Sequence, residues 1–174
     1  ADLGIPIVKT IAGDGIFEGA NAMWVDRRCV ILSLSARANR SGYDQIASEL
    51  TRQGVTDIIH MQIPYGHCHI DGLLNIASED TVLLHAMQVP YEVVDRLKKK
   101  GFNVLETPSL TETKYGYATN FVALDNGHVV TSNQAPQAVE LLEKNGIKVD
   151  VLDLSELNKG RGSVHCMTAF LKRD

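Results

Sequence analysis

The sequence predicts an α/β protein built from repeated strand–strand–helix–strand modules. Three charged helical stretches each end at a glycine and continue into a strand, and these glycines (Gly54, Gly101 and Gly146) are 47 and 45 residues apart. Each glycine stands where the C-terminus of a helix favours a residue that tolerates positive φ. Two short apolar runs joined by a polar turn precede each helix, which is the pattern of a hairpin. A fixed period of this size indicates an array of equivalent modules.

The first module is predicted over 20–63 and the second over 69–107. In the first, the strands AMWV and CVILSL flank the turn Asp26-Arg27-Arg28, and a helix covers 41–53. In the second, LLNIA and TVLLHA flank Ser78-Glu79-Asp80, and a helix covers 90–100 with Pro90 at its start.

The third module is predicted over 117–153, and a single strand over 163–171 follows it. NFVAL and HVVTS flank the hairpin turn Asp125-Asn126-Gly127, and a helix covers 134–145. A single module cannot bury its own sheet face, so the modules are expected to pack on each other as one domain over 1–174.

Composition excludes several classes of protein. The chain is 44% hydrophobic and 22% charged, as in ordinary globular proteins, and its net charge of −4 argues against nucleic acid as a partner. No apolar run approaches the roughly 18–20 residues of a membrane-spanning helix. The three cysteines are an odd number in a chain too long to depend on disulfides, which favours free thiols and a cytoplasmic location.

Residue types that carry chemistry recur at equivalent module starts. Glu18 precedes the first module, His69 and Asp71 begin the second, Asn120 begins the third, and Cys166 follows His69 by 97 residues, about two periods. In a ring of modules, equivalent starts converge on the axis. The period therefore predicts a central pocket that holds these side chains.

Such a pocket suits a planar cation. A thiol needs help to become a thiolate near neutral pH, and a histidine or a bound cation supplies it. Two carboxylates facing a thiol bind a cation with several N–H donors, of which guanidinium is the biological example. We expect Glu18 and Asp71 to hold a guanidinium, Cys166 to attack its central carbon and His69 to move protons. Water would then release a urea-type product, and no cofactor is needed.

Five segments in order resemble motifs of the arginine deiminase and amidinotransferase superfamily, the penteins. They are Glu18-Gly19-Ala20-Asn21, Ser35-Ala36-Arg37-Ala38-Asn39, His69-Ile70-Asp71, Asn120 with its apolar strand, and Gly160-Arg161-Gly162 followed by His165-Cys166-Met167-Thr168. The resemblance implies a five-bladed α/β propeller with Cys166 as nucleophile and His69 as general acid and base. It implies that Glu18 and Asp71 bind guanidinium, that Arg37 and Arg161 contact the carboxylate of an amino-acid substrate, and that Asn21, Asn120 and Gly160 lie at the substrate site.

The implied activity is hydrolysis of the guanidino group of arginine, or of a close derivative, to citrulline and ammonia. An amidinotransferase with the same intermediate, a dimethylarginine hydrolase and a non-catalytic fragment or regulatory subunit are alternatives. Five modules would need roughly 240 residues, so the N-terminal modules are expected to be missing, or supplied by a second polypeptide. A homo-oligomer is also compatible with the sequence.

Simpler interpretations exist for the same residues. Cys29, within an apolar run, is expected in the core. His67, Cys68, His69, Asp71, His165 and Cys166 are residue types that zinc accepts. However, CxxC and HxxxH spacings are absent, and strand alternation would point Cys68 away from the two histidines. A cysteine protease would also pair thiol with imidazole, but the local cysteine signature is lacking. No metal site is therefore predicted.

Overall fold

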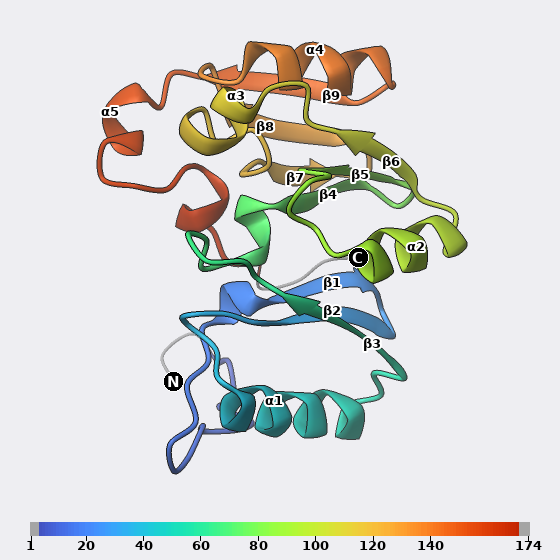
Figure 1. Ribbon diagram of the computed structural model, residues 1–174, viewed down its shortest axis with the longest axis vertical. Helices are drawn as coiled ribbons and strands as arrows, with labels where there is room; N and C mark the ends of the chain where they lie inside the picture. The colour runs from blue at the N-terminus through green and yellow to red at the C-terminus, as the bar shows by residue number, and fades with distance from the viewer. Residues whose placement is uncertain (1–3, 171–174) are drawn as a thin grey trace. The chain divides into compact units, whose positions relative to one another are not determined.

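A computed structural model describes residues 4–170 of the chain (Figure 1). The chain divides into two compact units, one ending at Cys68 and the other beginning at His69. The single domain expected over 1–174 stays a prediction. The first unit contains one strand–strand–helix–strand module and the second contains two.

The first unit is a three-stranded sheet with one long helix. Its strands are β1 (Ala22–Asp26), β2 (Cys29–Leu34) and β3 (Asp57–Gln62), with β2 in the centre. The β1–β2 pair is antiparallel, and β3 is parallel to β2 because α1 (Arg40–Arg52) returns the chain to the end of the sheet at which β2 begins. A short 3₁₀ helix, η1 (Gly19–Asn21), precedes β1.

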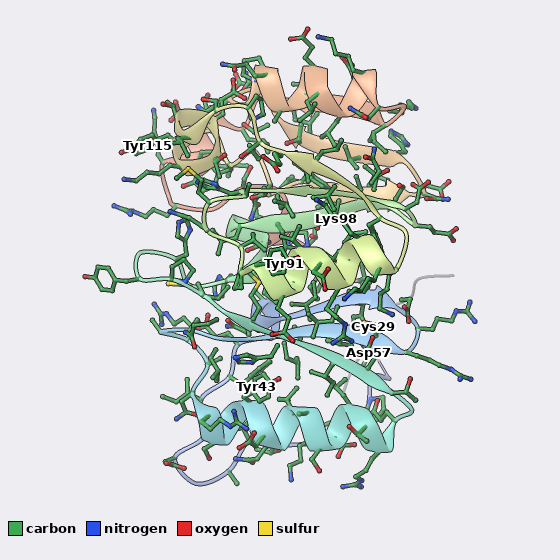
Figure 2. All side chains as sticks on the ribbon, turned by 45° about the vertical axis from the view of Figure 1, so that its right-hand side comes forward. Cys29, Tyr43, Asp57, Tyr91, Lys98 and Tyr115 are labelled. Atoms are coloured by element: carbon green, nitrogen blue, oxygen red, sulfur yellow. The ribbon has the colours of Figure 1, made fainter. Side chains whose placement is uncertain are left out.

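The core of the first unit lies between α1 and the sheet. Val30 and Leu32 of β2 pack with Tyr43 of α1 and with Val55. Figure 2 shows Tyr43 between the helix and the strands. The helix begins where the side chain of Asn39 accepts a hydrogen bond from the Gly42 N–H at 2.9 Å, as N-cap residues do.

The second unit repeats this module twice. The first copy consists of β4 (Leu74–Ser78), β5 (Thr81–Leu84), α2 (Tyr91–Lys99) and β6 (Asn103–Glu106). The second consists of β7 (Val122–Asp125), β8 (His128–Ser132), α4 (Pro136–Lys144) and β9 (Lys148–Leu152). In both sheets the hairpin pair is antiparallel and the strand after the helix is parallel, as in the first unit. The predicted α/β class with repeated modules is therefore confirmed.

The glycines that end the helices have the predicted backbone. Gly54, Gly101 and Gly146 have φ values of 100°, 92° and 82°. In each case the residue after the glycine donates its N–H to a carbonyl inside the helix, for example Phe102 to Leu97 at 3.1 Å. This arrangement gives otherwise unpaired carbonyls a donor and turns the chain into the next strand.

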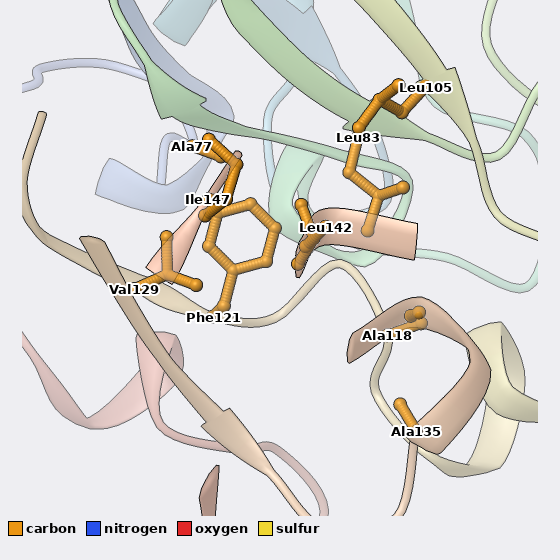
Figure 3. Close-up of a cluster of buried hydrophobic side chains, with 10 residues drawn as sticks. Ala77, Leu83, Leu105, Ala118, Phe121, Val129, Ala135, Leu142 and Ile147 are labelled. Carbon is orange, nitrogen blue, oxygen red and sulfur yellow. The ribbon is translucent and has the colours of Figure 1, made fainter. Parts of the chain in front are cut away.

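The two modules of the second unit share one apolar core (Figure 3). Phe121 is fully buried and packs in one cluster with Ala77 and Leu83 of the preceding module and with Val129 and Leu142 of its own. The Asn75 amide joins the same modules by donating to the carbonyls of Thr119 and Phe121 at 3.0 and 2.8 Å. The expectation that modules pack on each other therefore holds within this unit.

Two short helices were not predicted. They are α3 (Leu110–Tyr115) and α5 (Ser155–Asn158). The first is capped by the Ser109 hydroxyl, which accepts from the Glu112 N–H at 3.2 Å. The buried Glu112 carboxylate in turn accepts from the N–H groups of Gln137 and Ala138, so it caps α4 and fixes α3 against it.

The predicted strand over 163–171 is wrong for its described part, 163–170. This segment contains no strand and forms the 3₁₀ helix η3 (His165–Met167) instead. Its N–H groups bond locally, Met167 to the Val164 carbonyl at 3.2 Å and Thr168 to that of His165 at 3.1 Å. The N–H of His165 donates to the side chain of Asn120 at 3.1 Å, so the backbone is satisfied by contacts that are not strand pairing.

No helix within residues 4–170 has both the length and the apolar character needed to cross a membrane.

Candidate active site

Four side chains from three distant segments meet in the second unit. Asp71 lies in the 3₁₀ helix η2 (Ile70–Gly72), Asn120 lies just before β7, and His165 and Cys166 lie in η3. The Cys166 thiol lies 3.7 Å from Asp71 Oδ2, although 95 residues separate the two in the chain. The module period predicted the meeting of Asp71, Asn120 and Cys166, which begin successive modules or follow the last one.

Asn120 connects the members of this cluster. Its Nδ2 donates to Asp71 Oδ2 at 2.9 Å and to Cys166 Sγ at 3.1 Å, while its Oδ1 accepts from the backbone N–H groups of His165 at 3.1 Å and Cys166 at 3.4 Å. Because Asn120 and Asp71 are buried, these hydrogen bonds hold both side chains in place. One amide thus fixes the nucleophile candidate, the carboxylate and the backbone of η3.

His165 is the residue that the sequence prediction missed. Its Nδ1 lies 2.8 Å from Asp71 Oδ2. In the predicted strand, adjacent residues would have pointed to opposite faces, which separates His165 from Cys166. In a 3₁₀ helix, successive side chains are only about 120° apart, so both reach the same carboxylate. The adjacency of His165 and Cys166 in the sequence was the one available signal. Whether the two side chains reach the same carboxylate can be decided only when the local backbone conformation is known.

The loop before Cys166 has a backbone that few residues adopt. Arg161 and Gly162 have φ values of 66° and 116°, and a Cβ on Gly162 would lie 3.3 Å from the Cβ of Cys166 and 3.4 Å from its sulfur. The Gly162 N–H donates to the Tyr117 hydroxyl at 3.2 Å, and Tyr117 itself has a φ of 57°. Such left-handed conformations at non-glycine residues cluster where surrounding contacts over-determine the backbone, often at functional sites.

The environment raises the pKa of the Cys166 thiol. Burial is the larger cause, and the negative charge of Asp71 is the next; hydrogen bonds from the Ser163 backbone and the Asn120 amide act in the opposite direction. Cys166 is nonetheless accessible from solvent. A positive charge placed beside Asp71 and Cys166 would reverse the electrostatic part of this effect, because it would favour the thiolate.

Three predicted site residues lie in the first unit. Arg37 forms an ion pair with Glu18, with 3.5 Å between Nη1 and Oε1, and both side chains are well exposed. Asn21 is fully buried, and its Oδ1 accepts from the hydroxyls of Ser33 at 2.7 Å and Ser35 at 2.9 Å. The structure therefore brings Glu18 and Arg37 together, whereas Asn21 lies within the packing of its own unit.

The remaining predicted residues flank the cluster of the second unit. His69 is half-buried and immediately precedes η2, two residues before Asp71. Gly160 and Arg161 follow α5, and their N–H groups donate to the carbonyls of Leu157 and Asn158, both at 3.0 Å. Their roles as general acid and base and as substrate contacts stay predictions.

Local structure also places the other cysteines and the residues considered as zinc ligands. Cys29 is fully buried in β2, as expected, and Cys68 is exposed. Residues 67–69 do not lie in a strand, so the alternation invoked for their side chains does not apply. Among residues 4–170, no three His, Cys, Asp or Glu side chains are grouped as metal ligands would be.

Comparisons with known proteins identify relatives along the chain. The sequence profile of the arginine deiminase family matches residues 85–173, just over half of the chain. Arginine deiminase of Lactococcus lactis subsp. lactis (strain IL1403) is 25% identical over 194 aligned residues, covering 90% of this chain and 47% of that protein. The chain spans about half the length of the curated relatives it matches.

Solved structures with the same fold include different activities. SxtG, an amidinotransferase from Microseira wollei, superimposes with a TM-score of 0.75 at 19% identity, over 88% of this chain and 47% of that one. DDAH from Pseudomonas aeruginosa, in complex with citrulline, gives a TM-score of 0.68 at 23% identity, over 88% and 55%. These likenesses confirm the pentein type of fold. Because the family profile also covers half of the chain, including Asn120, His165 and Cys166, the chain belongs to the arginine deiminase family.

Proposed function

We propose that this chain carries the nucleophile half of an enzyme that hydrolyses the guanidino group of arginine or a close derivative. The observation that carries the proposal is the contact of Cys166 with Asn120 at 3.1 Å and with Asp71 at 3.7 Å. A buried carboxylate beside a thiol is unfavourable for thiolate formation on its own. The same pair becomes favourable when a cation binds between them, which points to a positively charged substrate.

The proposed reaction begins when the guanidinium binds Asp71. The added positive charge lowers the pKa of Cys166, the thiol loses its proton, and the sulfur attacks the central guanidinium carbon. A carbon–nitrogen bond then breaks, the departing nitrogen takes up a proton and leaves as ammonia, and a covalent thiouronium remains on Cys166. Water adds to the same carbon and loses a proton. The carbon–sulfur bond breaks, which releases the ureido product and restores the thiol.

His69 is the proposed carrier of protons for both steps, because it immediately precedes the short helix that presents Asp71. Glu18 is the second proposed carboxylate for the guanidinium. Arg37 and Arg161 are proposed to bind the carboxylate of the amino-acid substrate, since guanidinium groups pair with carboxylates in bidentate geometry.

The proposal is tested by incubating the protein with L-arginine and measuring citrulline and ammonia. Cys166→Ala is expected to abolish both products, while Cys68→Ala, which changes an exposed cysteine in the other unit, is expected to retain them. The test is made with this chain and with a longer chain that matches the length of the relatives. Equal product formation by wild type and Cys166→Ala, or no product from either length, would refute the hydrolase.

An amidinotransferase is the second candidate, because SxtG has the same fold. Both activities would share the thiouronium intermediate and differ in whether water or an amine resolves it. Release of ornithine from L-arginine only after an amine acceptor is added would favour the transferase. Release of citrulline without an acceptor would favour the hydrolase. Turnover of dimethylarginine in preference to L-arginine would indicate a dimethylarginine hydrolase.

A further inference from the structure

We infer that His165 competes with the substrate for Asp71. Its imidazole contacts the carboxylate oxygen of Asp71 that a guanidinium must bind, and it binds this oxygen again when the neutral product forms. The inference deepens the proposed function and rests on it. It assigns His165 to control of ligand binding, and it does not make His165 a carrier of protons.

The hydrogen bonds of Asp71 show why a guanidinium and His165 would compete for the same oxygen. Asp71 Oδ2 lies 2.8 Å from His165 Nδ1 and accepts from Asn120 Nδ2 at 2.9 Å. Because a carboxylate oxygen has two lone-pair sites, these two short contacts take up its stronger acceptor positions. The thiol of Cys166 makes a longer contact with the same oxygen, at 3.7 Å. A guanidinium N–H that is to place its carbon against that sulfur therefore has to displace one of the two donors.

His165 is the donor that can leave. The Asn120 side chain is buried and makes three further hydrogen bonds, to Cys166 Sγ and to the backbone N–H groups of His165 and Cys166. The side chain of His165 is 26% exposed, whereas that of Asp71 is 5% exposed. Rotation of the imidazole toward solvent would leave the backbone of η3 bound to Asn120, so the ring can move while the nucleophile keeps its place.

The difference in charge between substrate and product gives the exchange a direction. A guanidinium is a cation with several N–H donors and gains a charge-assisted pair with Asp71, which offsets the loss of the imidazole contact. The ureido product is neutral, so its hydrogen bonds to the carboxylate are weaker. The imidazole is then the better partner, and its return to Asp71 promotes release of the product.

Binding measurements test the inference without turnover. In a Cys166→Ala background, L-arginine and L-citrulline are titrated into the otherwise unchanged chain and into His165→Ala by calorimetry. Removing the imidazole is expected to lower the dissociation constants of both ligands by about three- to tenfold, because the contact between Asp71 and His165 no longer has to be broken before a ligand binds. His165→Gln, whose amide can still donate to Asp71, is expected to give an intermediate dissociation constant.

The chain offers a matched control. His128 Nε2 lies 2.7 Å from Asp150 Oδ2, a contact like that of His165, but on the β8–β9 pair. His128→Ala is expected to leave both dissociation constants unchanged. In ¹⁵N spectra of the imidazoles, addition of L-arginine is expected to shift the His165 ring signals and to leave those of His128 in place. A His165 Nδ1 signal that keeps the position of a carboxylate-bonded nitrogen after L-arginine binds would contradict the exchange.

The outcomes separate this inference from the proposed function. Tighter binding by His165→Ala supports the inference even if the wild-type protein turns over no L-arginine. Binding that is equal, weaker or undetectable in both proteins overturns it, even if wild-type turnover is normal. A His165→Ala variant, with Cys166 present, that binds L-arginine as wild type does but forms product much more slowly would also overturn it, because His165 would then act in the chemistry.

Discussion

Asn120 uses both ends of its side-chain amide, and the neutrality of this amide matters as much as its shape. In Asn120→Asp, a second carboxylate would lie beside Asp71 and the sulfur, where Nδ2 now donates at 2.9 and 3.1 Å. The added negative charge should raise the pKa of Cys166 further. Alkylation by iodoacetamide at pH 7.5 should then slow severalfold, because a smaller fraction of the thiol is ionised. Asn145→Asp, an exposed change of equal charge, is the control, and a similar slowing there would remove the local explanation.

The raised pKa of Cys166 predicts how stability depends on pH. The folded protein holds the thiol proton more tightly than the unfolded chain does, because burial and the charge of Asp71 disfavour the thiolate. The resulting stability is fully present below the pKa of the unfolded thiol, about 8.5, and is lost as pH rises through the higher folded pKa. In urea titrations, the free energy of unfolding should therefore fall more steeply above pH 8.5 in wild type than in Cys166→Ser. Parallel curves would contradict the raised pKa.

The residues of the site differ in how far the sequence could predict them. Asp71, Asn120 and Cys166 are spaced by the module repeat, so their convergence follows from period alone. His165 could not be placed the same way, because its direction depends on whether residues 165–167 form a strand or a 3₁₀ helix. In the 3₁₀ helix, the N–H groups of His165 and Cys166 donate to Asn120 Oδ1. A contact between residues so far apart in the chain leaves no pattern in the local sequence.

At the scale of elements, the loop that leads into η3 depends on Tyr117. Its hydroxyl accepts from the Gly162 N–H at 3.2 Å and so fixes a left-handed segment beside Cys166. Tyr117→Phe is expected to destabilise the protein by about 0.5–1.5 kcal/mol and to lower the alkylation rate of Cys166, because the loop loses an anchor. Tyr115→Phe, an exposed site at the end of α3, is the matched control (Figure 2). Equal effects of the two changes would exclude the specific role of Tyr117.

The helix-terminating glycines act through the backbone. Gly101 has a φ of 92°, and a Cβ there would meet no atom within 4 Å, so a substitution meets backbone strain without a steric clash. Gly101→Ala is expected to lower the free energy of unfolding by about 1–2 kcal/mol, and Gly101→Asn by less, since Asn tolerates left-handed backbone better. Thermal denaturation of the pair checks this order. A neutral Gly101→Ala would mean that the turn relaxes to another conformation.

Long periodic elements were predictable and short capped ones were not. The strands over 29–34 and 128–132 match the predicted runs, because apolar residues bounded by polar turns are a strong local signal. The six-residue helix α3 has too few residues for a visible period. The spacing of Ser109 and Glu112 at its start is the capping-box pattern, which could have revealed it.

For the chain as a whole, Glu18 is proposed as a second carboxylate that binds the guanidinium. Glu18 lies in the first unit, whereas Asp71 and Cys166 lie in the second. Glu18→Gln is expected to lower kcat/KM for L-arginine by about tenfold or more, because one carboxylate for the guanidinium is lost. Alkylation of Cys166 in the absence of substrate should stay unchanged. Glu140→Gln, which removes another exposed carboxylate paired with a cation, is the control. A drop in Cys166 alkylation would assign Glu18 a structural role instead.

The modular architecture was predictable because each module leaves an apolar sheet face that only a neighbour can cover. The shared cluster around Phe121 and the Asn75 hydrogen bonds are that coverage in the second unit. The period does not predict which side chains seal the junction, since these depend on packing between strands distant in sequence. It also does not distinguish a hydrolase from a transferase, because both are proposed to use the same thiouronium on the same cysteine.

Covalent catalysis by Cys166 is tested by the mass of this residue during the reaction. The protein is mixed with L-arginine, quenched in acid after a short interval, and digested for mass spectrometry. We expect a covalent adduct on the peptide that contains Cys166, present with L-arginine, absent with L-citrulline and absent in Cys166→Ala. Formation of citrulline by a protein whose Cys166 stays unmodified, or an adduct on Cys68 instead, would contradict covalent catalysis by Cys166.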